Sequence, residues 1–322
     1  MFGSHLSIAG GMHLALLEAQ KLDMACVQVF TKNQRQWSVK PLRDEEVRDW
    51  HSHRKSTGLR CVVSHDSYLI NLASPDDTAR EKSIALFREE LSRCEALEIP
   101  YLVTHPGAHM GSGDEAGLLR VASALDRLHE ELPSYRTVTC IEATAGQGTS
   151  LGHRFEHLRA ILDQVKHPER VGVCIDTAHI LEAGYDLSSS DGARATLDEL
   201  QAIVGLDRVK VLHVNDSKTP RGSRVDRHEH IGQGHVALDA FAVILRHPVL
   251  SSLPKILETP KDGSAPDGRE WDTVNIETLT RLIDGNAPAG NSNAAAATSD
   301  KTPSTPKAAR TPAEKNMKRR EK

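Results

Sequence analysis

Short apolar runs alternate with longer amphipathic segments along residues 1–284. Each run is rich in β-branched residues and closes on a polar or charged group, a pattern that predicts β-strands separated by α-helices. Residues 74–97, between two of these runs, predict a helix that Ser74 caps and Pro75 opens. Its apolar residues Ile84, Phe87, Leu91 and Cys94 share one face. The eight runs span residues 2–5, 25–30, 60–64, 101–105, 138–142, 171–176, 209–213 and 255–258.

Strands that alternate with helices in this way are typical of the α/β class, because the helices then cover a parallel sheet. Right-handed crossovers close such units into either a barrel or a doubly wound sheet. The count of eight favours the TIM (β/α)8 barrel, and 322 residues exceed the roughly 250 that this fold commonly needs. In either architecture, residues at the C-terminal ends of the strands meet at the active-site mouth.

The composition changes after residue 284. Residues 285–322 carry eight Lys or Arg against three Asp or Glu, whereas residues 1–284 have a net charge of −9. Met317 is the only large apolar residue of this segment, so the segment cannot bury enough surface to offset the entropy of ordering. We therefore expect a barrel domain at 1–284 and a disordered basic tail at 285–322. Nucleic-acid contact, nuclear import and simple solubilisation are all roles that fit the tail.

Neither a membrane span nor a cysteine-based site is expected. No apolar run approaches the roughly 18 residues of a spanning helix, and no Lys or Arg precedes Lys21, as a leader peptide would require. The expected location is the cytoplasm, or the nucleus of a eukaryotic cell if the tail directs import. The five cysteines are at least 33 residues apart and show no CxxC spacing, so we expect them to be structural.

Histidine and carboxylate residues stand at the ends of nearly all the predicted strands. Because parallel strands of one barrel end at a common mouth, these distant residues are expected to form one cluster. Imidazoles and carboxylates without thiolates suit catalytic Zn²⁺ or Mn²⁺ better than a closed structural zinc site. The residues are His5, His65, His105, Glu142, Asp176, His179, His213 and Glu258, with Asn33 slightly beyond the second run.

Two short pairs of residues predict more than one ion. Asp176 with His179, and Asp226 with His228, each offer a carboxylate and an imidazole to the same metal or to neighbouring metals. The second pair lies in a segment, 223–230, that also fits an ordinary polar loop, and His230 competes with His228 for the role. Histidines in helix or turn contexts are expected to face solvent; these are His51, His53, His129, His157, His167 and His247.

No nucleotide cofactor is expected. The sequence has no Gly-Lys dipeptide for a P-loop, and the glycines at 146, 148 and 152 miss the dinucleotide-binding spacing by one residue. This glycine-rich turn follows Glu142 closely. It either lets the backbone approach a substrate phosphate or is a plain loop.

Longer motifs make the chain similar to a known family. Two of them, Thr-Lys-Asn-Gln-Arg-Gln-Trp at 31–37 and His-Asp-Ser-Tyr-Leu-Ile-Asn at 65–71, are not required by a barrel as such. Together with the others, they resemble the endonuclease IV family of zinc-dependent apurinic/apyrimidinic endonucleases, from residue 3 to about residue 260. The others are His105-Pro-Gly, Glu142-Ala-Thr-Ala-Gly-Gln-Gly148, Cys174-Ile-Asp-Thr-Ala-His179, His213-Val-Asn-Asp216, Ser223-Arg-Val-Asp-Arg-His228 and Leu257-Glu-Thr259.

The resemblance implies three zinc ions held by nine ligands. Carried over position by position, the first ion would be bound by His65, His105 and Glu142. The second would be bound by Glu142, Asp176, His213 and Glu258, so that Glu142 bridges two ions, and the third by His179, Asp226 and His228. Two neighbouring positions depart from the family pattern, with Ala143 in place of a common Asn and Ala178 in place of a frequent Cys. Neither is a ligand, and the first departure affects a contact outside the ligand set.

The reaction implied by the resemblance is hydrolysis of the phosphodiester 5′ to an abasic site in duplex DNA, which leaves a 3′-hydroxyl. Hydroxide generated by the zinc ions would attack, with Glu142 and Glu258 as the catalytic residues that position the water. Trimming of damaged 3′ ends by the same phosphodiesterase chemistry is also expected. The enzyme is expected to act as a monomer.

The resemblance also implies which residues contact DNA. Arg35, Tyr68 and Leu69 match residues that insert into the base stack at a lesion, although Tyr68 and Leu69 also fit simple packing under a loop. Further DNA contacts are expected from His5 and Asn33. Candidates for phosphate binding are Arg35, Lys32, Arg221 and Arg224.

Two other functions compete with DNA repair. A metal-dependent sugar isomerase or epimerase of the same barrel type needs only Glu142, Asp176, His213 and Glu258, and leaves the remaining ligands and the 31–37 motif unexplained. A noncatalytic DNA-binding or scaffold protein that uses the basic tail explains none of the ligands. Metal content and cleavage of abasic DNA distinguish these alternatives.

Overall fold

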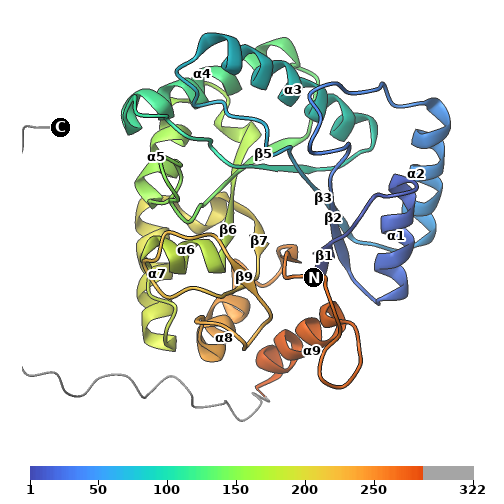
Figure 1. Cartoon of the computed structure of the whole chain (residues 1–322), viewed down its shortest axis with the longest axis vertical. Helices are drawn as coiled ribbons and strands as arrows, with labels where there is room; N and C mark the ends of the chain where they lie inside the picture. Colours follow the sequence, from blue (N-terminus) through green and yellow to red (C-terminus); the bar gives the residue numbers. More distant parts are fainter. Residues whose placement is uncertain (286–322) are drawn as a thin grey trace, which may run out of the picture. The chain divides into compact units, whose positions relative to one another are not determined.

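Eight parallel strands close into a barrel in the computed structural model of the chain, which describes residues 1–285 (Figure 1). Neighbouring strands follow chain order around the ring, and β10 closes it against β1, where Gly3 lies opposite Ile256. The predicted TIM barrel is confirmed, and the doubly wound sheet is excluded. Each predicted run agrees with an observed strand to within one residue at both ends. The strands are β1 (Phe2–His5), β2 (Cys26–Val29), β3 (Cys61–His65), β4 (Tyr101–Thr104), β5 (Val138–Glu142), β6 (Val171–Asp176), β7 (Val209–His213) and β10 (Lys255–Leu257).

Helices surround the barrel and alternate with its strands (Figure 1). They are α1 (Met12–Lys21), α2 (Asp44–Ser56), α3 (Asp77–Ala96), α4 (Asp114–Glu131), α5 (Phe155–Gln164), α6 (Thr177–Ala183), α7 (Ser190–Ile203), α8 (Leu238–Arg246) and α9 (Trp271–Asp284). Two 3-10 turns, η1 (Pro168–Arg170) and η2 (Leu206–Arg208), precede β6 and β7, and a short antiparallel pair, β8 (Asp216–Ser217) and β9 (His228–Glu229), follows β7. Within residues 1–285, no helix is both long and apolar enough to cross a bilayer. Apart from Gly285, which caps α9, the predicted basic tail lies outside the described residues.

Side chains of the strands point alternately into the barrel and outward to the helices. On β2, Val27 and Val29 belong to the large core beneath the helices, whereas Cys26 belongs to a smaller core inside the barrel. The inner core also contains Cys61, Cys140 and Cys174. All five cysteines are buried and free, which agrees with the structural role predicted for them.

The predicted start of the helix at 74–97 is wrong by two residues. α3 begins at Asp77, and its N-cap is Asp76, whose Oδ1 accepts a hydrogen bond from the Ala79 amide at 2.7 Å. Ser74 lies before the cap, where its hydroxyl accepts from the Asp76 amide at 3.3 Å. An N-cap oxygen must reach an amide two or three residues ahead, and in this chain the Asp76 carboxylate does so. The predicted apolar face is confirmed, since it is buried at Ile84, Phe87, Leu91 and Cys94.

Two of the histidines predicted to face solvent are buried. His129 is 2% exposed on α4, and His157 is 4% exposed on α5. Nδ1 of His157 accepts from the Gly152 amide at 3.2 Å, and its Nε2 lies 3.3 Å from Asp114 Oδ2. These rings occupy positions on the inner faces of their helices that an apolar residue would otherwise take.

Candidate metal centre and active site

The residues predicted at the strand ends converge at the mouth of the barrel. His65, Glu142, Asp176 and His213 end β3, β5, β6 and β7, and Glu258 follows β10 directly. Several groups of these side chains have donor atoms within 4.8 Å of one another. The groups are His65, His105 and Glu142; Glu142, Asp176, His213 and Glu258; and Asp176, His179 and His228, while a fourth places Cys174 beside Glu142 and His213.

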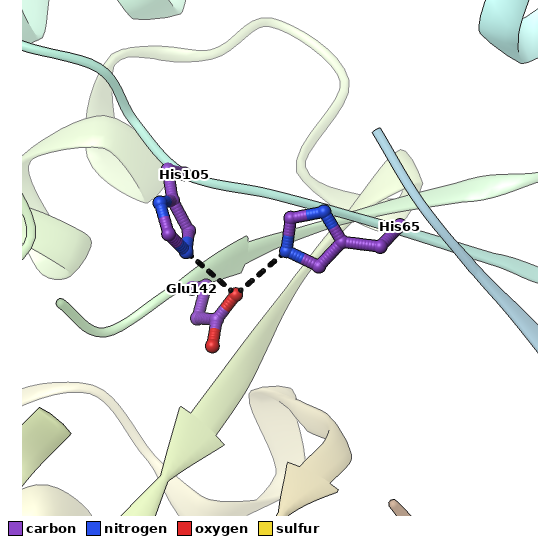
Figure 2. A group of neighbouring side chains, drawn as sticks. All are labelled: His65, His105 and Glu142. Atoms are coloured by element: carbon purple, nitrogen blue, oxygen red, sulfur yellow. Dashed lines mark hydrogen bonds and ion pairs between the residues drawn. The ribbon is translucent and has the colours of Figure 1, made fainter. Parts of the chain in front are cut away.

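Glu142 lies at the centre of the cluster and is fully buried. Its Oε2 faces two imidazoles, with the Nε2 atoms of His65 and His105 each 3.1 Å away (Figure 2). Its Oε1 faces a different imidazole, with His213 Nδ1 at 2.8 Å. The two oxygens of one carboxylate thus point to two different sets of ligands, which is the arrangement that a bridging ligand requires.

The second group surrounds Nδ1 of His213. Besides Glu142, this nitrogen lies 3.2 Å from Glu258 Oε2 and 3.9 Å from Asp176 Oδ2. His213 and Asp176 are fully buried, and the side chain of Glu258 is 12% exposed. Three carboxylates and one imidazole therefore enclose a single small volume.

The third group lies closer to solvent. His179 Nε2 is 3.3 Å from Asp226 Oδ2, and His228 Nε2 is 3.7 Å from Asp226 Oδ1 and 3.6 Å from Asp176 Oδ2. His230, the alternative to His228, instead stacks on Trp271 with ring centroids 3.7 Å apart. The geometry therefore brings His228, and not His230, to the cluster.

Local structure fixes Asp176 between the second and third groups. It is both the last residue of β6 and the N-cap of α6, where its Oδ1 accepts from the Ala178 and His179 amides at 2.7 and 3.0 Å. Its Oδ2 accepts from the Asn215 side chain at 2.7 Å, while Asn215 Oδ1 accepts from the Glu258 amide at 2.7 Å. Asn215 thus holds two acidic residues of the cluster in place.

Four imidazoles in the cluster donate one ring N–H to an oxygen outside it. Because those oxygens accept, the other ring nitrogen of each imidazole points into the cluster, where it carries a lone pair whenever the ring is neutral. Metal-ligating histidines are held in this way. The pairs are His65 Nδ1 with Asp66 O at 2.9 Å, His179 Nδ1 with Ala143 O at 3.0 Å, His213 Nε2 with Gln28 Oε1 at 2.8 Å and His228 Nδ1 with Glu258 O at 3.2 Å.

The inward lone pairs need a positive partner. The Nε2 atoms of His179 and His228 lie 3.4 Å apart, so they face each other across a distance that a shared proton or cation must bridge. The surrounding donors are imidazoles and carboxylates, which suit zinc, and their outer hydrogen bonds are in place. The residues present therefore fit a multinuclear zinc centre.

The pKa values of the cluster reflect the attraction between its imidazoles and its carboxylates. Burial alone would raise the pKa of Glu142, but the charges of His213 and His105 hold this pKa well below its usual range. Burial would lower the pKa of His65, yet the hydrogen bond with Glu142 raises it to about 9. Burial would also raise the pKa of Asp226, which its hydrogen bond with His179 lowers to about 2. Zinc would replace the protons on these imidazoles, so its binding would release protons.

Four of the predicted DNA contacts lie on two loops beside the cluster. Tyr68 is 60% exposed, and its ring centroid lies 5.4 Å from that of His65 and 6.0 Å from that of His105. Asn33 and Arg35 are exposed on the loop after β2. Leu69 is partly buried and packs against the core, so less of it is available to DNA.

His5 and Lys32 are positioned differently from the other predicted DNA contacts. His5 Nδ1 lies 3.1 Å from Glu258 Oε1, so its ring lines the cluster itself. Lys32 is buried, and its Nζ donates to Asn33 O and Gln36 O at 3.1 Å each and lies 3.6 Å from Glu90 Oε1. The prediction that Lys32 binds phosphate is therefore wrong, because its charge is satisfied inside the loop. Arg221 and Arg224 are exposed.

A cleft of about 530 Å³ adjoins the cluster. Tyr68, His105 and Asp226 line it, together with the glycine-rich turn at 144–150. On the same wall, the backbone of Gly107 has a φ of 94°, and a side chain at this position would collide with Asn71 Oδ1. The turn that the sequence left open as a substrate contact or a plain loop thus borders the space where a substrate would lie.

Two buried polar residues of this site escaped the sequence-based prediction. Gln28 bonds to both His213 and Glu258, and Asn215 bonds to Asp176 and Glu258. Asn215 lies inside the family motif at 213–216, and that motif was the signal that could have found it. The signal for Gln28 was a single amide in an otherwise apolar strand, at a position whose side chain faces the barrel interior.

Comparison with known proteins places this chain in a family. A family model described as a xylose isomerase-like TIM barrel matches residues 16–279. The "Probable endonuclease 4" of Chloroflexus aurantiacus is 48% identical over 284 residues, which cover 88% of this chain and 98% of the relative. The chain belongs to the endonuclease IV family. The crystal structure of endonuclease IV from Thermus thermophilus matches with a TM-score of 0.77 and 34% identity, over 88% of this chain and 99% of that one.

Membership of the endonuclease IV family confirms the family identified from the motifs, and with it the prediction of an endonuclease that acts in DNA repair. The epimerase alternative is supported only by similarity of fold. A D-tagatose 3-epimerase-like protein matches with a TM-score of 0.68 over 88% of this chain and 97% of that one, at 18% identity. The scaffold alternative does not account for the clustered ligands.

Proposed function

We propose that this endonuclease hydrolyses the phosphodiester 5′ to abasic sites in duplex DNA with three zinc ions, leaving a 3′-hydroxyl. The observation that carries the proposal is the set of four imidazoles whose outer nitrogens are hydrogen-bonded and whose inner nitrogens face carboxylates of the cluster. A sugar isomerase would need fewer ligands than the cluster offers. The name of the Chloroflexus relative agrees with the proposal.

The three groups of side chains would each hold one ion. The first set is His65, His105 and Glu142, the second is Glu142, Asp176, His213 and Glu258, and the third is His179, Asp226 and His228. Glu142 would be shared by the first two ions, as its two oxygens face two sets of nitrogens. The closeness of Asp176 to His228 couples the second set to the third.

Bound zinc would supply a nucleophile at neutral pH, by lowering the pKa of water, and would neutralise charge on the phosphoryl group and the leaving oxygen. The protein would orient the reacting groups. Glu142 and Glu258 both approach the His213 nitrogen, at 2.8 and 3.2 Å, and would position the attacking water between them. No side chain needs to act as a nucleophile.

The exposed loops would engage the lesion. Tyr68 and Arg35 lie at the mouth, where they can enter the base stack and contact the backbone, and Leu69 would support Tyr68 from its partly buried position. Asn33 would contact DNA from the same loop as Arg35. His5 would act from the edge of the cluster, beside Glu258.

The same centre would remove blocking groups from 3′ ends, since that reaction also breaks a phosphodiester. The enzyme would act as a monomer, because one chain supplies all nine ligands. Its substrate would be chromosomal DNA, which in a bacterium places the activity in the cytoplasm. No nucleotide cofactor would be required.

A labelled duplex with one abasic analogue tests the proposal. The wild-type chain should nick the strand 5′ to the analogue and leave an end that a DNA polymerase extends. Glu258→Gln should slow the nick roughly 100-fold, because an amide cannot replace a carboxylate beside a metal, whereas the control Asp163→Asn on the outer face of α5 should not. A nick on the 3′ side, or full activity in Glu258→Gln, would contradict the proposal.

A further inference from the structure

The side chain of Gln28 lies between two of the candidate zinc ligands. Gln28 is fully buried on β2. Its Oε1 lies 2.8 Å from His213 Nε2, and its Nε2 lies 2.6 Å from Glu258 Oε1. We propose that Gln28 is a positioning residue, which sets the tautomer of His213 and the orientation of Glu258 for the second metal. The inference rests on the proposed zinc centre.

The direction of each hydrogen bond follows from the chemistry of the groups. A carboxylate only accepts, so the NH₂ of Gln28 must face Glu258, and its carbonyl oxygen must then face His213. This oxygen also only accepts. Neutral His213 therefore carries its proton on Nε2, and its Nδ1 then presents a lone pair to Glu142, Asp176 and Glu258.

The side-chain amide of Gln28 also orients the carboxylate of Glu258. Oε1 of Glu258 receives the Gln28 amide and lies 3.1 Å from His5 Nδ1, so two neighbours hold this oxygen. Oε2 is left to face His213 Nδ1 at 3.2 Å. One side chain thus turns one oxygen of Glu258 and one nitrogen of His213 toward the same volume.

For His213 Nε2, no other hydrogen-bond partner lies within residues 1–285. Gln28 is the partner of Nε2 of His213 within the described chain, and both residues are fully excluded from solvent. Without the amide, His213 can move its proton from Nε2 to Nδ1. In either tautomer, the buried Nε2 atom is then left without a hydrogen-bond partner. Loss of a hydrogen bond of this kind to a metal ligand commonly lowers metal affinity or activity roughly 10- to 100-fold.

Two variants of the full-length protein separate this role from packing. Gln28→Met keeps the length of the side chain and removes both bonds. Gln28→Glu keeps the acceptor for His213 and replaces the donor to Glu258 by a second carboxylate oxygen. The control is Thr139→Val on β5, a buried substitution at a hydroxyl that has no hydrogen-bond partner among residues 1–285.

Zinc retention against a competing chelator is the primary measurement, with kcat and KM on abasic duplex DNA as the second. Both Gln28 variants should lose one zinc at roughly 10- to 100-fold lower chelator concentration than wild type. Their kcat should fall by a similar factor, while KM changes little because no DNA-facing residue has changed. Thr139→Val should match wild type in both assays.

The outcomes distinguish the two proposals. If wild type holds three zinc ions and both Gln28 variants retain them as tightly, with unchanged kcat, the positioning role is wrong. If Gln28→Met does not fold, Gln28→Glu still decides the question, because it preserves size and polarity. If wild type itself binds fewer than two zinc ions, the proposed function fails before the role of Gln28 is reached.

Discussion

Two cationic residues of the same loop, Lys32 and Arg35, have opposite environments. Lys32 is buried against Glu90 and donates to two backbone carbonyls of the loop, whereas Arg35 is exposed. Thr31 also donates to Glu90, at 2.9 Å, so the loop that carries Arg35 is fastened to α3. Lys32 therefore shapes the loop, and the exposed Arg35 is the residue that we propose contacts DNA.

The salt dependence of DNA binding should separate these roles. Each phosphate contact contributes about 0.9 to the slope of log K against log salt, so Arg35→Ala should reduce this slope by about 1. Lys32→Met should leave the slope unchanged but lower stability by about 3 kcal/mol, because it leaves Glu90 buried without its cation. A reduced slope in Lys32→Met would show that this lysine meets phosphate after all.

Removing the Tyr68 ring should weaken binding to the lesion. Stacking of an aromatic ring on a base contributes about 1 to 3 kcal/mol, so Tyr68→Ala should weaken the affinity for abasic duplex roughly 5- to 150-fold. Zinc content should not change, since the phenol is no ligand, and Tyr68→Phe should bind almost as wild type does. Equal affinity of Tyr68→Ala and wild type in a fluorescence-anisotropy titration would rule out insertion.

At the scale of elements, α4 carries a buried titratable group outside the metal centre. Burial, together with the charge of Arg170, lowers the pKa of His129 to about 4. Neither ring nitrogen has a hydrogen-bond partner within residues 1–285. The folded protein therefore keeps this ring neutral under conditions in which the unfolded chain protonates it.

This difference predicts a loss of stability in acid. Because the folded pKa lies below the unfolded value of 6.5, the unfolded state binds more protons between pH 6.5 and about 4, so stability falls as the pH falls through this range. The loss should be about 2 kcal/mol at about pH 5. The free energy of unfolding should be measured with urea at neutral pH and at this acidic pH, at equal zinc concentration. Between the two pH values, His129→Leu should lose less of this free energy than wild type does, by the amount given. Equal losses in both proteins would refute the assignment.

The strands were predictable from the sequence, and the side-chain directions in the loops were not. Strand periodicity and the order of elements determine that eight strand ends meet, so the position of Glu142 near His213 follows without coordinates. The loop at 31–37 has no period that could indicate whether Lys32 points inward. Both Ser74 and Asp76 offer a side-chain oxygen that could cap α3. Sequence spacing does not decide between them, and in the structure Asp76 accepts from the Ala79 amide.

At the scale of the whole molecule, topology turns distance along the chain into proximity. Gln28 and His213 are 185 residues apart and hydrogen-bonded, and Asn215 and Glu258 are 43 apart. The ligand types at the strand ends were visible in the sequence. The hydrogen-bond partners of Gln28 were not, because an amide in a strand reveals its partner only when the register of the closed barrel is known.

Charge also acts at this scale. Residues 1–284 have a net charge of −9, which opposes the approach of DNA, but the carboxylates at the strand ends gather acidic charge at the site where three zinc ions would add about +6. Removal of zinc by a chelator should therefore weaken DNA binding as well as abolish cleavage. Binding of abasic duplex that is unaffected by the chelator would show that the metals have no part in capturing the substrate.

The proposed trinuclear centre depends above all on the number of zinc ions that one chain binds. Elemental analysis of the purified full-length protein should give three zinc ions, and His228→Ala should lose one of them while the barrel stays folded. Fewer than two tightly bound ions in the wild-type chain would show that the cluster is not a multinuclear zinc centre.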